Sequence, residues 1–352
     1  MKFDAVVGNP PYQGVNHQQI YPYFYLAAKQ VSNNYVTLIF PTGWQEPKNA
    51  NNLSKLNNPE VKQDKQIVSI DNRQNVFPGI SGAEWVNIIL WKKGYDNNLD
   101  GKQLFLTNGE TPEIKDLNWE VVTIPKPIEI LKLLETVKSC ENYIPLQNST
   151  STLKPYGLRT DVFDDFNKYN LKPMYDHPRS VSDLKVIGSK QIMYAPQDYK
   201  LPKCTNRIFK YKVFVPYAWG NMSKSAGLGG AYADIIIARP GEICTETYLE
   251  SGCFDDFYTA HKHAKYLMTK FARAMLFVNK NSQHSTTAWG DVPTQDYTEP
   301  WWSKSISELD EELANKYKLP NDIAEFIRMN IQTKNETNIL MLDANNTLKP
   351  IV

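Results

Sequence analysis

Two consecutive prolines follow directly on the first apolar segment of the chain, Phe3–Val7. Pro10 and Pro11 have no backbone N–H group and a fixed φ angle, so neither can continue a helix or a central strand. The apolar segment must therefore end just before them. We expect a short buried strand that stops abruptly and presents Asn9–Tyr12, with the sequence NPPY, at the end of a sheet.

The first 95 residues alternate strand-like and helix-like segments. Apolar residues at helical spacing predict a helix over Ile20–Val31. Runs of β-branched and aromatic residues predict further strands at Tyr35–Phe40, Ile67–Ile70 and Val86–Trp91. Because these runs are apolar on both faces, we expect a parallel sheet covered by helices, which is an α/β fold.

The chain changes character after residue 125. The segment Pro127–Ser139 predicts an amphipathic connecting helix, and short β-like segments rich in turn residues follow it. Helical periodicity returns at 261–279 and 305–330. We therefore divide the chain into a first domain at 1–125, a second, α+β domain at 126–335 and a C-terminal tail at 336–352.

Composition excludes several classes of protein. With 41% hydrophobic and 22% charged residues, the chain is typical of a globular protein, and no apolar run approaches the roughly 18 residues of a membrane span. The N-terminus lacks the basic and apolar regions of a signal peptide. The four cysteines are widely spaced and form no CxxC pair, so we expect reduced thiols in a cytoplasmic protein without a metal site.

The motif GNPPY after an apolar strand resembles the catalytic motif of amino-methyltransferases that use S-adenosylmethionine, (D/N/S)PP(Y/F). The resemblance implies that the Asn9 side-chain oxygen and the Pro10 carbonyl accept hydrogen bonds from the target amine. The nitrogen lone pair, otherwise delocalised into a purine ring, can then face a methyl group. Pro11 helps to hold the two acceptors in place, and Tyr12 offers a flat face to an extruded base.

Two other interpretations of this motif stay open. Asn-Pro and Pro-Pro are common turn dipeptides, so the tetrapeptide can be a simple turn. Glutamine methyltransferases that act on proteins use the same tetrapeptide on an amide. They resemble this chain only within the first domain.

The wider resemblance is to Eco57I-like DNA methylases of the γ arrangement, which modify adenine N6 in restriction-modification systems. The stretch YVTLIFPTGWQ is similar to the next family strand, and NVFPGIS is similar to the family's V-F-x-G segment. The resemblance implies that Phe77 flanks the other face of the flipped base; a core phenylalanine beneath a turn is the alternative. In the second half the similar segments are Thr269–Arg273, Lys280–His284, Val292–Tyr297 and Leu309–Leu319.

Members of this family carry the cofactor-binding half, with its Gly-rich turn, before NPPY, whereas only eight residues precede Asn9 here. The glycine-rich run at 227–230 does not follow the first strand of a βαβ unit, so it does not match the cofactor loop. We expect a partial sheet with an exposed apolar edge, and incomplete binding of S-adenosylmethionine. A separate polypeptide with the cofactor half, self-association, and an inactive remnant that still binds DNA are three open alternatives.

Residues 185–224 hold eight basic residues and one acidic residue, a net charge of +7 compared with +1 for the whole chain. Aromatic residues are interleaved with them. Basic side chains bind the phosphates of DNA, and aromatic and polar side chains contact its bases. Double-stranded DNA is therefore the expected partner. The predicted contacts are Lys190, Lys200, Lys203, Arg207, Lys210, Lys212, Trp219, Asn221, Ser223 and Lys224. A β-rich domain with a lysine-rich solvated face is the alternative.

Taken together, the sequence predicts a partial Rossmann-like methyltransferase sheet joined to an α+β target-recognition domain. The predicted function is that of a DNA adenine N6-methyltransferase component of a restriction-modification system, incomplete by itself. The alternative is a catalytically inactive subunit that binds DNA sequence-specifically.

Overall fold

The computed structural model describes residues 2–15, 20–41, 64–73, 76, 86–96, 100, 104–107, 127–218, 234–279 and 288–351. The chain is mixed α/β and forms two compact units, an N-terminal unit, Met1–Leu131, and a C-terminal unit, Lys132–Val352. The boundary falls within helix α3 (Ile128–Lys138), a few residues after the division at 125/126 that the sequence suggested.

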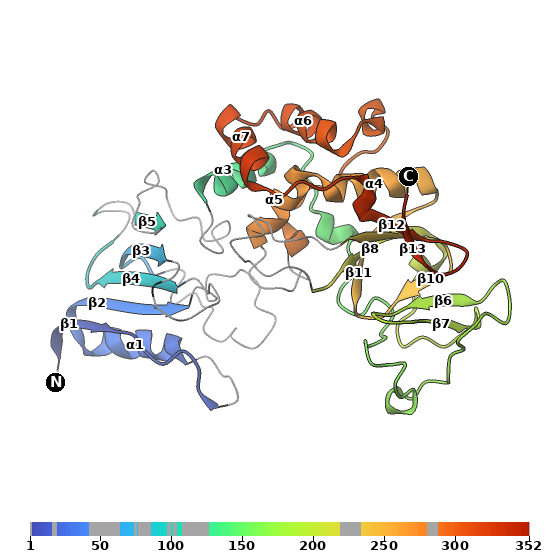
Figure 1. Ribbon diagram of the computed structural model, residues 1–352. Helices are drawn as coiled ribbons and strands as arrows, with labels where there is room; N and C mark the ends of the chain where they lie inside the picture. The colour runs from blue at the N-terminus through green and yellow to red at the C-terminus, as the bar shows by residue number, and fades with distance from the viewer. Residues whose placement is uncertain are drawn as a thin grey trace. The chain divides into compact units, whose positions relative to one another are not determined.

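The N-terminal unit contains a five-stranded sheet in the order β1-β2-β4-β3-β5 (Figure 1). Its strands are β1 (Phe3–Gly8), β2 (Ser32–Pro41), β3 (Ile67–Arg73), β4 (Val86–Lys92) and β5 (Leu104–Thr107). Strand β1 is parallel to β2, and β3 is parallel to β5, but β4 is antiparallel to both of its neighbours. The prediction of a parallel sheet is therefore wrong for β4. Apolar residues on both faces indicate that a strand is buried. They do not indicate whether the strand runs parallel or antiparallel to its neighbours.

Helix α1 (Tyr21–Val31) joins β1 to β2 and covers one face of this sheet. Pro22 lies in its first turn, where the missing N–H costs no intrahelical hydrogen bond. Tyr21, Tyr25 and Ala28 pack with apolar residues of the central strands, which are Val36, Leu38, Ile67, Ile70, Ile89 and Trp91.

Strand β1 lies at the end of the sheet and is more exposed than the sequence suggested. Val6 packs against the core on the α1 face. Phe3, Ala5 and Val7 alternate with it and are exposed, Phe3 to 50% and Val7 to 76%. The prediction of a buried strand is wrong for these side chains, because within the described residues β1 pairs with β2 alone. The apolar edge that the sequence analysis expected is present.

The C-terminal unit contains two sheets. The first is three-stranded, in the order β10-β6-β7, and the second is five-stranded, in the order β11-β8-β9-β12-β13. The strands are β6 (Leu184–Ile187), β7 (Ile192–Ala195), β8 (Tyr211–Pro216), β9 (Ile235–Ala238), β10 (Glu242–Cys244), β11 (Tyr248–Phe254), β12 (Ile339–Leu342) and β13 (Leu348–Pro350). Short strands joined by turns agree with the α+β character expected for this half.

Four helices accompany the five-stranded sheet of the C-terminal unit. They are α4 (Phe257–Met268), α5 (Lys270–Asn279), α6 (Ile306–Lys316) and α7 (Asn321–Asn330). Helix α4 packs against β8, β9 and β11, and α5 and α6 pack against α4. Ser305 and Glu308 form a capping box at the start of α6, so this acidic segment is a helix cap, as its sequence indicates. Within the described ranges, no helix has the length and apolar character that crossing a membrane would require.

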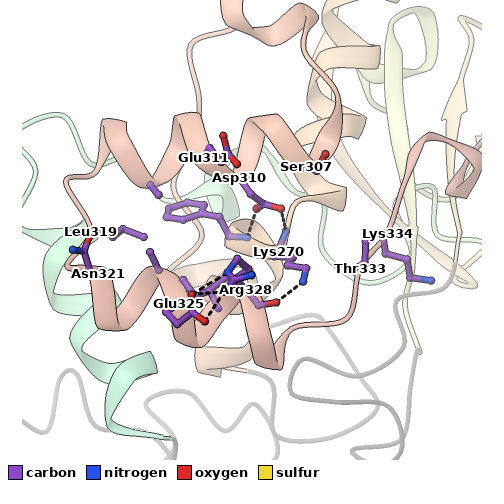
Figure 2. A pocket seen from close by; sticks show the side chains of 14 residues that line it. Lys270, Ser307, Asp310, Glu311, Leu319, Asn321, Glu325, Arg328, Thr333 and Lys334 are labelled. Atoms are coloured by element: carbon purple, nitrogen blue, oxygen red, sulfur yellow. Dashed lines mark hydrogen bonds and ion pairs between the residues drawn. The ribbon is translucent and has the colours of Figure 1, made fainter.

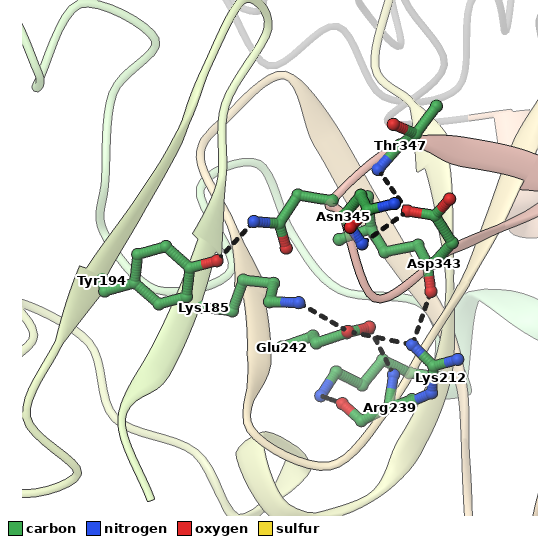
Figure 3. Close-up of polar contacts among 10 residues, drawn as sticks. Lys185, Tyr194, Lys212, Arg239, Glu242, Asp343, Asn345 and Thr347 are labelled. Atoms are coloured by element: carbon green, nitrogen blue, oxygen red, sulfur yellow. Dashed lines mark hydrogen bonds and ion pairs between the residues drawn. The ribbon is translucent and has the colours of Figure 1, made fainter. Parts of the chain in front are cut away.

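The last residues are part of the C-terminal unit, so the prediction of a separate tail at 336–352 is wrong. Strand β12 is parallel to β9, and β13 is antiparallel to β12. The turn between them is tied to the rest of the unit by side chains (Figure 3). Asn346 donates to the Tyr194 hydroxyl at 2.6 Å, and the Arg239 guanidinium donates to the Leu342 carbonyl at 2.7 Å.

Gly157 lies close to Pro202, so replacing it with alanine should destabilise the fold. Gly241, which has a similar φ angle but open space around it, is the control. Gly157 has φ +77°, and a Cβ atom on it would lie 2.6 Å from Pro202 Cβ; Gly241 has φ +83° and open space around that position. Gly241→Ala should cost about 1 kcal/mol for the left-handed backbone. Gly157→Ala should cost about 1–3 kcal/mol more because of overpacking. Urea denaturation measures both, and equal losses of unfolding free energy would contradict the packing argument.

Candidate functional site

The NPPY segment leaves the sheet at the carboxyl end of β1. Gly8 is the last residue of β1 and lies opposite Leu38 of β2. Strands β1, β2, β3 and β5 run in the same direction, so their carboxyl ends meet at one edge of the sheet. In open α/β sheets, ligands bind outside this edge.

The four residues of NPPY have different degrees of exposure. Asn9 and Pro11 are exposed, Pro10 is buried, and Tyr12 is half-buried against the core under α1. The carbonyl of Tyr12 accepts a hydrogen bond from the N–H of Ile20 at 3.2 Å. No described residue forms a hydrogen bond with the Asn9 side chain. The buried proline and the packed tyrosine thus hold the bend in place and leave the Asn9 amide facing solvent.

Further polar residues lie at the same edge, and the sequence analysis did not select them. Asn72 of β3 and Asn87 of β4 lie directly opposite each other, one step beyond Ile70 and Ile89 on the α1 face. Both asparagines are fully buried. Asp71 points to the other face, where its carboxylate accepts from Arg73 Nε at 2.6 Å. The sequence signal that could have identified them is the presence of polar residues inside the apolar runs IVSIDNR and VNIILW.

Several predicted residues lie outside the described part of the chain. These are Phe77, Trp219, Asn221, Ser223, Lys224 and the glycine-rich run at 227–230. Their assigned roles stay predictions.

Three of the predicted DNA contacts are exposed lysines of the C-terminal unit. Lys190, Lys200 and Lys203 are all open to solvent. Lys190 lies in the turn between β6 and β7, and the Lys203 ammonium donates to Thr152 Oγ1 at 3.0 Å. These ammonium groups can reach a polyanion without losing a strong partner.

Two others, Arg207 and Lys210, are partly engaged within the protein. The half-buried Arg207 guanidinium donates to the carbonyls of Ser149 at 2.9 Å and Gly252 at 3.3 Å. Lys210 forms an ion pair with the exposed Asp255. Both cations precede β8, at the end of the sheet where β11 finishes.

Lys212 does not fit the prediction of a DNA contact. Its side chain is fully buried, and its ammonium donates to the carbonyls of Ile208, Lys210 and Arg239, each at 3.1 Å. Loss of hydration lowers the pKa of Lys212 to about 8. This lysine ties together the loops around β8 and does not reach solvent.

Ser251, His263 and Tyr297 form a buried chain of hydrogen bonds. Ser251 Oγ lies 2.9 Å from His263 Nε2, and Tyr297 Oη lies 2.6 Å from Nδ1. Ser251 and His263 have almost no exposed surface, so a substrate could not reach the serine. We therefore interpret this chain as a satisfied core network. No described group of three His, Cys, Asp or Glu side chains has the geometry of a metal site.

A cavity of about 490 Å³ lies between α5, α6 and α7 (Figure 2). Four of its charged side chains, Lys270, Asp310, Glu325 and Arg328, are engaged within the protein. The Asp310 carboxylate accepts from the backbone N–H groups of Lys270 at 3.1 Å and Phe271 at 2.8 Å, and burial raises the pKa of Asp310 to about 6. Arg328 and Glu325 pair at 2.6 Å. Because Asp310 caps α5, we assign this cavity to helix packing.

Comparison with known families identifies the N-terminal segment. Residues 1–77 match the family model of the Eco57I restriction-modification methylase. The resemblance predicted from the sequence is therefore confirmed for this segment, which is similar to restriction-modification methylases. It contains NPPY and strands β1, β2 and β3. No curated protein matches the chain.

Solved structures of restriction-modification enzymes show limited likeness. The type IIL enzyme MmeI, solved in complex with DNA, is 11% identical with a TM-score of 0.44, over 92% of this chain and 51% of that chain. The type IIG endonuclease BpuSI is 12% identical with a TM-score of 0.32, over 94% of this chain and 46% of that chain. A type I methyltransferase subunit from Streptococcus thermophilus is 18% identical with a TM-score of 0.24, over 39% of this chain and 32% of that chain. The chain thus spans about half the length of the first two. Identities and TM-scores this low establish neither a shared fold nor a shared function.

The buried histidine generates a pH prediction. Desolvation lowers the pKa of His263 from 6.5 to about 3. Below pH 6.5 the unfolded chain binds a proton that the folded chain does not, so the free energy of unfolding falls as the pH decreases. Between pH 7 and pH 5 this loss should be about 2 kcal/mol.

His263→Gln keeps a polar group opposite Ser251 but does not titrate in this range. Urea denaturation at pH 7 and pH 5 should therefore show a smaller loss of unfolding free energy for this variant than for the parent chain. An identical loss in both proteins would show that His263 is not the group responsible.

Proposed function

We propose that this chain is the base-binding and target-recognising part of a DNA adenine N6-methyltransferase of a restriction-modification system. The observation that carries this proposal is the position of NPPY at the carboxyl edge of β1, with Asn9 exposed, in a segment of the Eco57I type. A simple turn would not require an asparagine that is exposed and has no hydrogen-bonding partner among the described residues.

The chemistry follows from the two acceptors of the motif. The Asn9 side-chain oxygen and the Pro10 carbonyl would each accept one N–H of the adenine N6 amine. The nitrogen is then drawn toward a tetrahedral geometry, so its lone pair points away from the ring and becomes nucleophilic. Pro11 stiffens this arrangement, and Tyr12 supports the extruded base by stacking. No covalent intermediate with the protein is needed.

S-adenosylmethionine is the methyl donor that this reaction class uses. Beside β1 the described residues form no Gly-rich turn, so we assign no residue of this chain to the cofactor. We propose that a separate polypeptide that binds this cofactor packs against β1, and that self-association is the alternative. The exposed apolar side chains of Phe3 and Val7 support a partner at β1, since apolar surfaces of this kind mark interaction sites.

Double-stranded DNA is the proposed substrate, and a cytoplasmic location goes with it. The exposed lysines Lys190, Lys200 and Lys203 are proposed to bind its phosphates. A catalytically inactive, sequence-specific DNA-binding subunit is the second candidate function.

Methyl transfer tests the proposed role of Asn9. The chain is expressed together with its neighbouring genes, so that a complementing polypeptide co-purifies, and is incubated with labelled S-adenosylmethionine and random-sequence duplex DNA. We expect labelled N6-methyladenine, and we expect Asn9→Ala to reduce its formation at least about 100-fold. Asn33→Ala, an exposed asparagine at the amino end of β2, is the control and should retain full activity. DNA binding without methylation in any of these samples would favour the inactive subunit.

The salt dependence of DNA binding tests the lysines. Replacing Lys190, Lys200 and Lys203 by alanine should weaken binding of duplex DNA. The slope of log affinity against log salt should become shallower by about 0.9 for each phosphate that is no longer neutralised. Lys349→Ala removes an exposed lysine that pairs with Asp343 at 3.2 Å and should leave the slope unchanged. An unchanged slope in the triple variant would place the phosphate-binding groups elsewhere.

A further inference from the structure

One end of the five-stranded sheet carries two aromatic side chains that are open to solvent. Strand β11 ends at Phe254, opposite Tyr211 at the start of β8. Phe209 precedes the start of β8, and Tyr258 follows the end of β11. Both residues therefore lie at this end of the sheet. Phe209 is 53% exposed and Tyr258 is 75% exposed.

Cations lie on the same segments as these two rings or on neighbouring ones. Lys210 pairs with Asp255, which joins the segment before β8 to the segment after β11. Arg207 is held by the carbonyls of Ser149 and Gly252, and Lys203 by Thr152. We call this region the end surface and define it as Lys203, Arg207, Phe209, Lys210, Asp255 and Tyr258.

Two exposed acidic groups lie near this surface, and both are engaged. Asp255 pairs with Lys210, and Asp256 caps α4 by accepting from the Thr259 N–H at 2.8 Å and the Thr259 hydroxyl at 2.8 Å. A third acid near Arg207 and Lys203, Glu250, is buried and accepts from the Tyr156 hydroxyl, and burial raises the pKa of its carboxyl group. The three cations of the end surface therefore outnumber the two exposed carboxylates. An exposed aromatic pair with surplus positive charge fits a nucleic acid better than an acidic or purely apolar partner.

Tyr258 stands on a rigid support. It lies in the capped first turn of α4, and its ring packs against Phe257 at 5.8 Å between centroids. Phe257 packs in turn against Tyr211 at 6.3 Å and is stacked on His261 at 5.8 Å. A ring held in this way loses little conformational freedom when it binds a ligand.

We propose that the end surface binds unstacked bases of DNA, with Tyr258 and Phe209 as stacking platforms and with Lys203, Arg207 and Lys210 at the adjoining phosphates. A fully paired duplex hides the faces of its bases, whereas extrusion of one base exposes the faces of its neighbours. The inference rests on the proposed function, because that function requires an extruded adenine. It adds a residue, Tyr258, that recognises the opened duplex.

Equilibrium binding of the full chain to three DNA probes tests this inference. The probes are a fully paired duplex of about 20 base pairs, the same duplex with one unpaired adenine, and the single strand. We expect the parent chain to prefer the duplex with the unpaired base over the paired duplex. Tyr258→Ala should reduce affinity for the unpaired-base duplex about tenfold, while affinity for the paired duplex stays the same.

Two further variants separate stacking from other effects. Tyr258→Phe keeps the ring and should retain the preference. Tyr23→Ala removes an aromatic ring that is 49% exposed on α1 of the N-terminal unit, and it should bind all three probes as the parent chain does. Loss of affinity in Tyr258→Phe would assign the effect to the hydroxyl and overturn the stacking proposal.

The outcomes distinguish this inference from the proposed function. If the parent chain binds none of the probes, the proposed function itself is wrong. If the parent chain binds DNA and Tyr258→Ala keeps the same preference among probes, the function stands and the inference is overturned. If Tyr258→Ala leaves all DNA binding unchanged but abolishes binding to a co-purified polypeptide, the end surface belongs to a protein partner, which also overturns the inference.

Discussion

Pro10 and Pro11 cannot donate backbone hydrogen bonds, and the rest of the N-terminal unit is organised around this constraint. Strand β1 must stop at Gly8, so the next residues leave the sheet at the edge where the parallel strands end. Pro10 is buried and Tyr12 packs against the core, which holds the bend rigidly. A rigid bend keeps the Cα atom of Asn9 in one place and leaves its side-chain amide open to a ligand. The proposed chemistry depends on this property.

The cost of removing water from a charged side chain determines which basic residues of the C-terminal unit stay exposed and could contact the proposed DNA substrate. A lysine is placed inside a protein only when several acceptors replace the water that it loses. Lys212 has three carbonyls and a lowered pKa, and it belongs to the core. Lys190 and Lys200 remain at the surface. The charge excess between residues 185 and 224 is thus divided between structural and accessible groups, and only the accessible ones can contribute to binding.

Local patterns predicted many of the elements well. Helical spacing located α1, including Pro22 in its first turn, and the apolar runs located β2, β3 and β4. The direction of β4 and the role of residues 336–352 could not be predicted, because both depend on pairing with strands that are distant in the chain. The Asn72–Asn87 pair was missed for the same reason. In the sequence, each asparagine only interrupts an apolar run. The register of the β3–β4 pairing places the two opposite each other.

The sequence by itself determined the NPPY motif, the family to which its segment is similar and the approximate division into two units. These follow from covalent geometry and from the order of residue types, which do not change on folding. Only the tertiary structure decided that β1 lies at the end of a mixed sheet, that Lys212 is buried, and that Phe209 and Tyr258 are both exposed. Burial and exposure result from packing between distant segments, and no local pattern of residues contains that information.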